Sequence, residues 1–546
     1  MKSKKLTTVS GVVVDPLSRT MQGMELTIRD GVIVSRQKRD SIRGPFILPG
    51  FIDAHVHIES SMLIPSRFAA MAVKHGTVGV VTDPHEVANV AGTEGIRFMM
   101  KDASTSPMGF YFGVPSCVPA SPLEKSGAII TEQEVLQLLE SGEFYYLSEM
   151  MNFPGVVFDD PQVHQKLVHA RNMKMPVDGH APGLSGTQLK KYIKAGITTD
   201  HECSSLNEAE EKLSLGMKIL IREGSAARNF DALIPLMEKY SNQLMFCTDD
   251  CHPDYLSKGH INKMVSRGLE KGYDIFDLLD VACVNPVKHY NLPVGLLQEG
   301  ESADFVVITS LEQMQVQATW IGGEPVFYQN SPGISLPERS APVYPFRDAF
   351  QKGLLRVVAS GSILNVIEAI DGELFTRWKQ VNTELGREVV IDTNQDLLKI
   401  VLLDRYAATE PVVAYINGFG LKKGAMACSV AHDSHHIIAV GCSEPDLDVA
   451  LQWVVQKRGG MCFTLDGETK GIELPYFGLM SDVQGEEVAL EYEQLSALPQ
   501  MQGSSLSAPF MTLSFMALTV IPQLKINHKG LFNSQDFQNI SLFQQA

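Results

Sequence analysis

The chain has 546 residues, of which 44% are hydrophobic and 20% are charged, a composition typical of folded globular proteins. This balance excludes a disordered, collagen-like or coiled-coil chain, and the length predicts roughly two to four domains. The formal net charge of -17 disfavours binding to nucleic acid, because an acidic surface repels phosphate backbones and the sequence has no compensating basic patch.

The chain termini and the cysteines indicate where the protein works. The N-terminal segment is basic but lacks the apolar run and the cleavage site of a signal peptide. The longest apolar run, residues 508–521, is shorter than the roughly 18 residues of a membrane span, so we expect a buried element there. The eight cysteines are scattered, with no CxxC pair. We therefore expect a cytoplasmic protein with reduced thiols and without a membrane partner.

The first 45 residues and the segment after residue 290 have the character of short strands. An Asp30-Gly31 turn signal separates two β-branched runs, a pattern typical of a hairpin. Strand character returns at residues 303–308 and 318–326. We expect residues 1–45 and 290–345 to form one small β-sandwich domain from both flanks of the region between them.

Residues 46–289 alternate between apolar strands and amphipathic helices. Helical stretches are predicted at residues 132–140, 187–194 and 206–215. Eight strand–helix alternations over this length are what a (β/α)8 barrel requires. The predicted strands end at residues 53–57, 80–83, 110–114, 145–149, 176–180, 197–201, 218–223 and 244–249.

A linker rich in proline and serine spans residues 331–345 and precedes a third region, residues 346–546. Strands are predicted there at residues 399–403, 411–416 and 437–440, and a helix at residues 447–456. We therefore expect a C-terminal α/β domain.

The strongest chemical signal is the run Leu-Pro-Gly-Phe-Ile-Asp-Ala-His-Val-His, which ends the first barrel strand. Residues two apart on a strand point the same way, so His55 and His57 can present both imidazoles to one metal ion. The carboxyl ends of barrel strands are also where such enzymes keep their active sites. The alternative is that two histidines fall at this spacing by chance.

The ends of the other predicted strands make chance a poor explanation. Imidazoles and carboxylates suit a divalent metal such as Mn, Fe or Zn. A solvated loop residue is the alternative for each of these residues taken singly, but the set at successive strand ends predicts a metal site. The set consists of Asp83, His85 and Glu86 after the second strand, Glu149 after the fourth, His180 after the fifth, His201 after the sixth, Arg222 and Glu223 at the seventh, and Asp249 after the eighth.

These motifs resemble a known family. Residues 49–57 resemble the first-strand signature of the amidohydrolase superfamily. The longer sequence motifs at residues 53–61 and 81–90 resemble those of the bacterial adenine deaminases of that superfamily. The resemblance covers nearly the whole chain and continues through the motifs at residues 178–183, 200–202, 248–250, 431–435 and 474–482. His436 departs from the family pattern, where a neutral polar residue is expected.

The resemblance implies two divalent metal ions bridged by a hydroxide, with Mn²⁺ or Fe²⁺ favoured and Zn²⁺ as the alternative. It implies that His55 and His57 bind the more buried metal, that His180 and His201 bind the outer one, and that Glu149 bridges them. Many relatives bridge with a carboxylated lysine, but residues 145–153 contain none. The resemblance further implies that Asp249 contacts a metal and carries protons, and that the protein is a homo-oligomer.

The reaction implied is the hydrolytic deamination of adenine to hypoxanthine and ammonia, a step of purine salvage. Its catalytic residues would be Asp249 and Glu149. A neutral purine requires directional hydrogen bonds, for which His85, Glu86, Arg222 and Glu223 are candidates. Arg222 could equally form an internal salt bridge with Glu223.

Several alternatives stay open at this level. The segment 431–436 is either a polar turn between strands or a cover over the barrel mouth, and Cys203 and Cys251 are either soft ligands or small buried residues. Another binuclear amidohydrolase that acts on a cyclic amide or a related nucleobase is the second candidate function. A non-catalytic scaffold is the third, and the complete ligand set argues against it.

Overall fold

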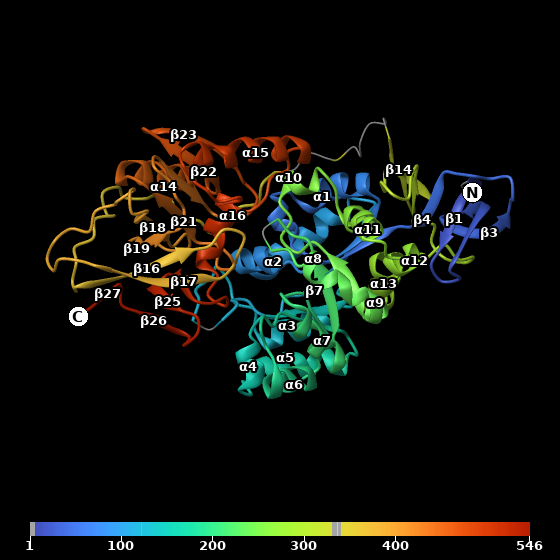
Figure 1. Cartoon of the computed structure of the whole chain (residues 1–546), viewed down its shortest axis with the longest axis horizontal. Coiled ribbons are helices and arrows are strands. Elements are labelled where there is room, and N and C mark those ends of the chain that lie inside the picture. The colour runs from blue at the N-terminus through green and yellow to red at the C-terminus, as the bar shows by residue number, and fades with distance from the viewer. Residues whose placement is uncertain (1–5, 122, 226, 330–335, 337–339, 546) are drawn as a thin grey trace.

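The computed structural model describes residues 6–121, 123–225, 227–329, 336 and 340–545, so much of the predicted linker lies outside the described residues. The chain forms three parts that lie side by side: a small sheet that includes the N-terminal strands, a central barrel and a C-terminal domain (Figure 1). The eight cysteines are free thiols. Among the described residues, no helix has both the length and the apolar character to cross a membrane.

Eight parallel strands form the predicted barrel. The eight strands fall into two sheets. A hydrogen bond from the Thr198 N–H to the Val177 carbonyl (2.8 Å) joins the sheets on one side, and a bond from the Asp249 N–H to the His55 carbonyl (2.9 Å) closes the barrel on the other. The (β/α)8 prediction is therefore confirmed. The strands are β5 (Phe51–Val56), β6 (Thr77–Thr82), β7 (Gly109–Val114), β8 (Tyr146–Met150) and β9 (Val177–Gly179) in one sheet, and β10 (Thr199–Asp200), β11 (Lys218–Arg222) and β12 (Leu244–Cys247) in the other.

Helices cover the outside of the barrel, and several of them begin with a side-chain cap. The helix predicted at residues 132–140 begins with a capping box, in which Thr131 and Glu134 satisfy one another's backbone N–H groups. The helices are α1 (Pro65–Ala72), α2 (His85–Ala103), α3 (Glu132–Glu140), α4 (Phe153–Val157), α5 (Pro161–Asn172), α6 (Gly186–Lys194), α7 (Leu206–Ser214), α8 (Phe230–Leu233), α9 (Met237–Tyr240), α10 (Pro253–Leu256), α11 (Ile261–Glu270), α12 (Ile275–Leu279) and α13 (Asn285–Tyr290).

The small part is a seven-stranded sheet made from both flanks of the barrel, in the order β15-β14-β13-β4-β1-β2-β3. Strand β4 leads into the barrel and pairs antiparallel with β13, which follows the barrel. The predicted hairpin around Asp30-Gly31 is present as β2 and β3. The strands are β1 (Leu6–Asp15), β2 (Thr20–Arg29), β3 (Val32–Lys38), β4 (Phe46–Pro49), β13 (Phe305–Ile308), β14 (Val316–Ile321) and β15 (Glu324–Tyr328).

The C-terminal part is built on a nine-stranded sheet in the order β17-β16-β19-β18-β21-β20-β22-β23, with β27 added beside β16. Its strands are β16 (Ile363–Ala369), β17 (Thr376–Asn382), β18 (Leu398–Leu403), β19 (Val412–Asn417), β20 (Ala425–Cys428), β21 (Ile437–Gly441), β22 (Gly460–Leu465), β23 (Glu468–Glu473) and β27 (Phe543–Gln544). Helices α14 (Glu444–Lys457), α15 (Gly485–Met501) and α16 (Pro509–Ser514) and a small sheet of β24 (Leu524–Asn527), β25 (Gly530–Asn533) and β26 (Gln538–Ile540) complete it.

The C-terminal part packs on the barrel over the carboxyl ends of the barrel strands. The apolar run 508–521, expected to be a buried element, forms α16 and the short helix η6 (Phe515–Ala517), and both are buried. Backbone hydrogen bonds also cross the boundary, because the Ser481 N–H donates to the Met62 carbonyl at 2.8 Å. One continuous apolar core therefore extends from the barrel into the C-terminal sheet.

Candidate metal centre and active site

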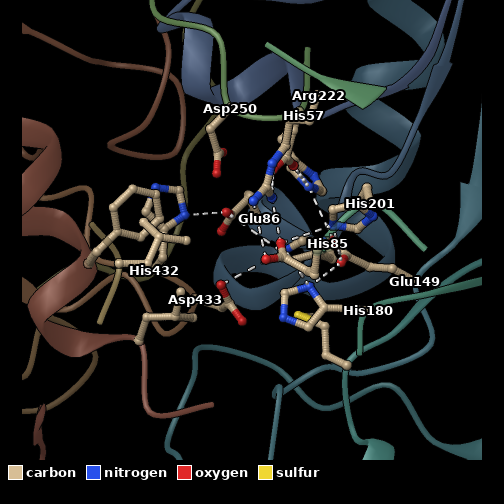
Figure 2. A pocket seen from close by; sticks show the side chains of 16 residues that line it. His57, His85, Glu86, Glu149, His180, His201, Arg222, Asp250, His432 and Asp433 are labelled. Atoms are coloured by element: carbon tan, nitrogen blue, oxygen red, sulfur yellow. Dashed lines mark hydrogen bonds and ion pairs between the residues drawn. The ribbon is translucent and has the colours of Figure 1, made fainter. Parts of the chain in front are cut away.

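The carboxyl ends of the barrel strands bring the six predicted metal ligands together around one pocket. Every one of these side chains is buried. Figure 2 shows imidazoles and carboxylates from separate strands that point toward a common centre. The six are His55 on β5, His57 directly after β5, Glu149 on β8, His180 after β9, His201 after β10 and Asp249 after β12.

The first group of ligand atoms surrounds His57. Its Nε2 lies 3.2 Å from His55 Nε2, 3.1 Å from Asp249 Oδ1 and 3.1 Å from Glu149 Oε1. Two imidazole nitrogens and two carboxylate oxygens thus converge in a buried space. Oxygen and nitrogen donors of these types are the ligands that a divalent transition metal prefers.

The tautomer of His57 supports this interpretation. Its Nδ1 lies 3.1 Å from the carbonyl oxygen of Asp83, which can only accept a hydrogen bond, so Nδ1 carries the proton. In the neutral ring Nε2 then presents a lone pair to the centre. Metal-binding histidines characteristically make such a bond through the ring nitrogen that does not bind the metal. The residues present therefore fit a metal ion.

A second group of ligand atoms lies on the other side of Glu149. His180 Nδ1 is 2.9 Å from Glu149 Oε2, and His201 Nε2 is 3.4 Å from the same oxygen. Glu149 thus turns one oxygen to each group, which is the geometry of a bridging ligand. Glu202 adds its Oε1 at 3.3 Å from His201 Nε2, although the sequence singled this residue out only as part of a motif.

The Glu149 carboxylate is held in its charged form. Burial by itself raises the pKa of the Glu149 carboxyl, but the adjacent imidazoles of His180, His57 and His201 outweigh it and hold the pKa well below its usual range. An ionised carboxylate is the form that binds a cation.

Arg222 joins two of the acidic side chains. Its Nη1 donates to Asp249 Oδ2 at 2.6 Å, and its Nη1 and Nη2 donate to the two carboxylate oxygens of Glu202. Burial raises the pKa of the Asp249 carboxyl, but the charge of Arg222 and the adjacent imidazoles of His55 and His57 bring it well below its usual range. The structure therefore pairs Arg222 with Glu202 and Asp249 and not with Glu223.

The predicted substrate-binding residues divide into two sets. His85, Glu86 and Arg222 line the pocket. Glu223 lies outside the pocket lining, and its carboxylate pairs with Arg267 at 2.9 Å. Cys203 and Cys251 are also outside the lining, so their positions are those of small buried residues and not of ligands.

The C-terminal part completes the pocket. Leu374, His432, Asp433, Phe515 and Leu518 line it opposite the barrel residues. None of these five was a candidate site residue, although the segment that holds His432 and Asp433 was considered as a cover over the barrel mouth. The structure places that segment there (Figure 2).

Two histidines of this segment hold the carboxylate of Glu86. His432 Nδ1 contacts one oxygen and His435 Nε2 contacts the other. The Ala431 N–H donates to His435 Nδ1 at 3.3 Å, so in the neutral ring Nε2 carries the proton and donates it to Glu86. Burial raises the pKa of Glu86, but the two imidazoles outweigh it and hold the pKa well below its usual range.

Comparison with known proteins agrees with the fold and the site. The model of the amidohydrolase family matches residues 46–326, and that of the adenine deaminase C-terminal domain matches residues 373–538. The chain belongs to the amidohydrolase family.

Full-length relatives define the branch within this family. An adenine deaminase of Parabacteroides distasonis is 46% identical over 100% of both chains, and one of Methanosarcina mazei is 46% identical over 98% of this chain and 99% of its own. One of Sulfurovum sp. is 47% identical over 96% of this chain and 98% of its own. Within the amidohydrolases, the chain is a member of the adenine deaminases.

Proposed function

We propose that this chain hydrolyses adenine to hypoxanthine and ammonia in the pocket between the barrel and the C-terminal part. The similarity to adenine deaminases over the full length of the chain supports the substrate. The observation that carries the chemistry is Glu149, which shares its two oxygens between two groups of buried histidines. A water molecule and adenine are consumed, and the amino nitrogen leaves as ammonia.

The ligand groups define which residues would hold two divalent metal ions. His55, His57 and Asp249 would hold one, His180 and His201 the other, and Glu149 both. A divalent ion lowers the pKa of a bound water toward ~7 and so makes hydroxide available at neutral pH. Nitrogen and oxygen ligands without a cysteine favour Mn²⁺ or Fe²⁺, with Zn²⁺ as the alternative.

The proton that hydrolysis moves is assigned to Asp249. Its carboxylate lines the pocket and is held ionised by Arg222, so it can accept the proton of the attacking water and deliver it to the departing amine. Acid–base help of this kind is typically worth about 10²–10⁴-fold in rate. Arg222 contributes by fixing the direction of the carboxylate.

Recognition of the purine is assigned to the polar groups around Glu86 and to an apolar wall formed by Leu374, Phe515 and Leu518. Adenine is neutral and presents both hydrogen-bond donors and acceptors at its edge. His85, Glu86 and Asp433 offer partners of both kinds in the pocket lining. The side chains of Leu374, Phe515 and Leu518 supply the apolar surface that a flat aromatic ring packs against.

A direct assay tests the proposal. Purified protein loaded with Mn²⁺ is mixed with adenine, and ammonia release is followed together with the change in absorbance from adenine to hypoxanthine. Adenosine and dihydroorotate serve as alternative substrates, and His55→Ala and Asp249→Ala as inactive controls. Turnover of adenine alone, lost in both variants, supports the proposal. Turnover of dihydroorotate would favour the cyclic-amide alternative. The presence of Glu149 in place of a bridging lysine argues against that alternative.

Two further expectations accompany this assignment. The family resemblance implies a homo-oligomer, which light scattering of the purified protein tests. A role in purine salvage follows from the conversion of one purine base into another, and the eight free thiols support a cytoplasmic location.

A further inference from the structure

A buried lysine lies directly behind the apolar wall of the pocket. Lys525 is on β24, and its side chain is buried within the C-terminal part. Its Nζ donates to the carbonyl of Leu374 at 2.7 Å and to the carbonyl of Phe515 at 3.1 Å. Among the described residues, no carboxylate forms an ion pair with this amine, and burial lowers its pKa to about 7.

The two carbonyls belong to the two segments that form the wall. Leu374 lies in the turn between β16 and β17, and Phe515 begins the short helix after α16. Both side chains line the pocket. The ring of Phe515 also stacks on the ring of His432, with centroids 4.8 Å apart and an angle of 21° between the planes. One amine therefore ties together two segments that are distant in sequence and touch the same cavity.

Only a long side chain with several donors can make this connection. Each buried carbonyl needs a hydrogen-bond donor, because an unsatisfied polar group in the interior is destabilising. A lysine carries its amine through apolar surroundings on an unbranched stem, and both the charged and the neutral amine have at least two N–H groups to donate. An apolar residue at this position would leave both carbonyls without a partner and would free the two segments to move apart.

We propose that Lys525 is a positioning residue for substrate binding, which fixes the spacing between Leu374 and Phe515 and so the apolar surface on which the purine ring packs. Through Phe515 it also fixes the ring of His432. The proposal rests on the adenine deaminase function proposed above. Lys525 contacts neither the candidate metal ligands nor the pocket itself. It therefore affects the affinity for the substrate and not the rate of the chemical step.

The test compares two buried lysines of the same part of the chain. Lys525→Met removes the connection, whereas Lys399→Met removes a lysine on β18 that donates to the Leu355 carbonyl (2.9 Å) and pairs with Glu444 outside the pocket lining. Loss of a buried hydrogen-bond partner at the wall is expected to raise the KM for adenine about tenfold in Lys525→Met. The kcat should stay within about twofold of wild type, because the reacting groups are untouched. Lys399→Met should leave both constants unchanged.

Two further measurements separate a positioning role from a general loss of structure. The inhibition constant of hypoxanthine reports binding alone, because the bound product is not turned over. It should rise in parallel with the KM. Lys525→Gln, which keeps two N–H donors on a shorter stem, should recover part of the loss. If Lys525→Met does not fold, Lys525→Gln carries the test by itself, and its KM should rise with kcat retained.

Three results would overturn the inference. An unchanged KM in Lys525→Met, an equal rise in Lys399→Met, or an equal fall of kcat in Lys525→Met would each show that the lysine is not a positioning residue for the substrate. If the wild-type protein releases no ammonia from adenine, the proposed function fails and this inference fails with it. If the wild type is active and only the KM prediction fails, the proposed function stands.

Discussion

At the scale of single residues, Glu149 connects the two groups of candidate metal ligands. Its two oxygens face two separate histidine groups, and the histidines in turn keep it ionised. Glu149→Gln keeps the shape but removes the charge. We expect the variant to lose at least one of the two metal ions per chain and to lose about 10²-fold or more in kcat, in line with the loss of a positioned charged group at a reacting centre.

Metal analysis of the purified variant, together with the ammonia-release assay, checks this prediction. Glu143→Gln is the matched control, because it makes the same chemical change at an exposed position in the loop before β8. Full metal content in Glu149→Gln would contradict the assignment of Glu149 as the bridging ligand.

The buried amine of Lys525 predicts how stability depends on pH. Its pKa is about 7 in the folded chain against 10.5 for an ordinary lysine, so between these values the unfolded chain binds more protons. Stability therefore rises with pH across this window, and below pH 7 the amine is charged in both states and opposes folding. We expect the wild type to gain up to about 1.4 kcal/mol per pH unit relative to Lys525→Met between pH 7 and 9.

Urea unfolding of both proteins at several pH values measures this difference. Lys399→Met again serves as the control, because this buried lysine has a charged partner, Glu444, whereas Lys525 has none among the described residues. A difference between wild type and Lys525→Met that does not change from pH 7 to 9 would show that the amine is not buried without a charged partner.

The candidate ligands could be predicted from the sequence because they lie on or directly after buried strands. Alternation along β5 and into the residue after it places His55 and His57 on one side, and the remaining ligands lie on or directly after strands whose apolar runs are easy to recognise. Glu202 could not be placed in this way. It follows β10 at a point where the chain has left the strand, so the alternation of side chains no longer says that it turns to the same centre as His201.

At the scale of elements, strands were easier to predict than the turns that complete the pocket. The eight barrel strands and the helices α3, α6 and α7 follow from their apolar patterns. Leu374 lies in a turn and Phe515 directly follows a short helix, and neither position has a motif. Their role depends on packing between segments far apart in sequence, which local patterns do not contain.

The segment 431–436 is the element through which the C-terminal part reaches into the pocket. His432 and His435 contact Glu86 but are not members of either candidate metal-ligand group around Glu149. We therefore expect the double variant His432→Ala/His435→Ala to lose about tenfold or more in kcat/KM, because a buried charged carboxylate loses both partners. Its metal content should stay at the wild-type level.

Kinetics with adenine and metal analysis on the same preparation check this expectation. His164→Ala, a histidine on α5 away from the pocket lining, is the control substitution. Normal kinetics in the double variant would show that the segment is only a polar turn between strands. Loss of metal would show that it supports the ligand groups instead of Glu86.

At the scale of the whole molecule, the pocket is narrow and lies between the barrel and the C-terminal part. The cavity has a volume of about 30 Å³, which is room for only a few water molecules. A purine therefore cannot enter without movement of the lining. The turn that carries Leu374 is the exposed end of the wall, since residues 371–373 and 375 around it are exposed.

Hydrogen–deuterium exchange tests this expectation. Residues 371–375 should exchange rapidly in the free protein and become protected when hypoxanthine is added, and the barrel segment 83–87 should gain protection in the same experiment. The strands of the small N-terminal sheet serve as the internal reference and should not respond. Protection of the barrel segment alone would show that substrate enters without movement of the C-terminal wall.

The seven-stranded sheet has a consequence for biosynthesis. Strand β4 pairs with β13, so Ile47 lies beside Val307 although the whole barrel separates them in sequence. On the ribosome, the free edge of β4 emerges about 250 residues before its partner, a delay of roughly 10–50 s at typical rates of 5–20 residues per second. During that interval an unpaired, apolar strand edge is available to other chains. The nascent protein is therefore most exposed to aggregation while its barrel is being translated, and a chaperone that covers β4 would have its greatest effect then.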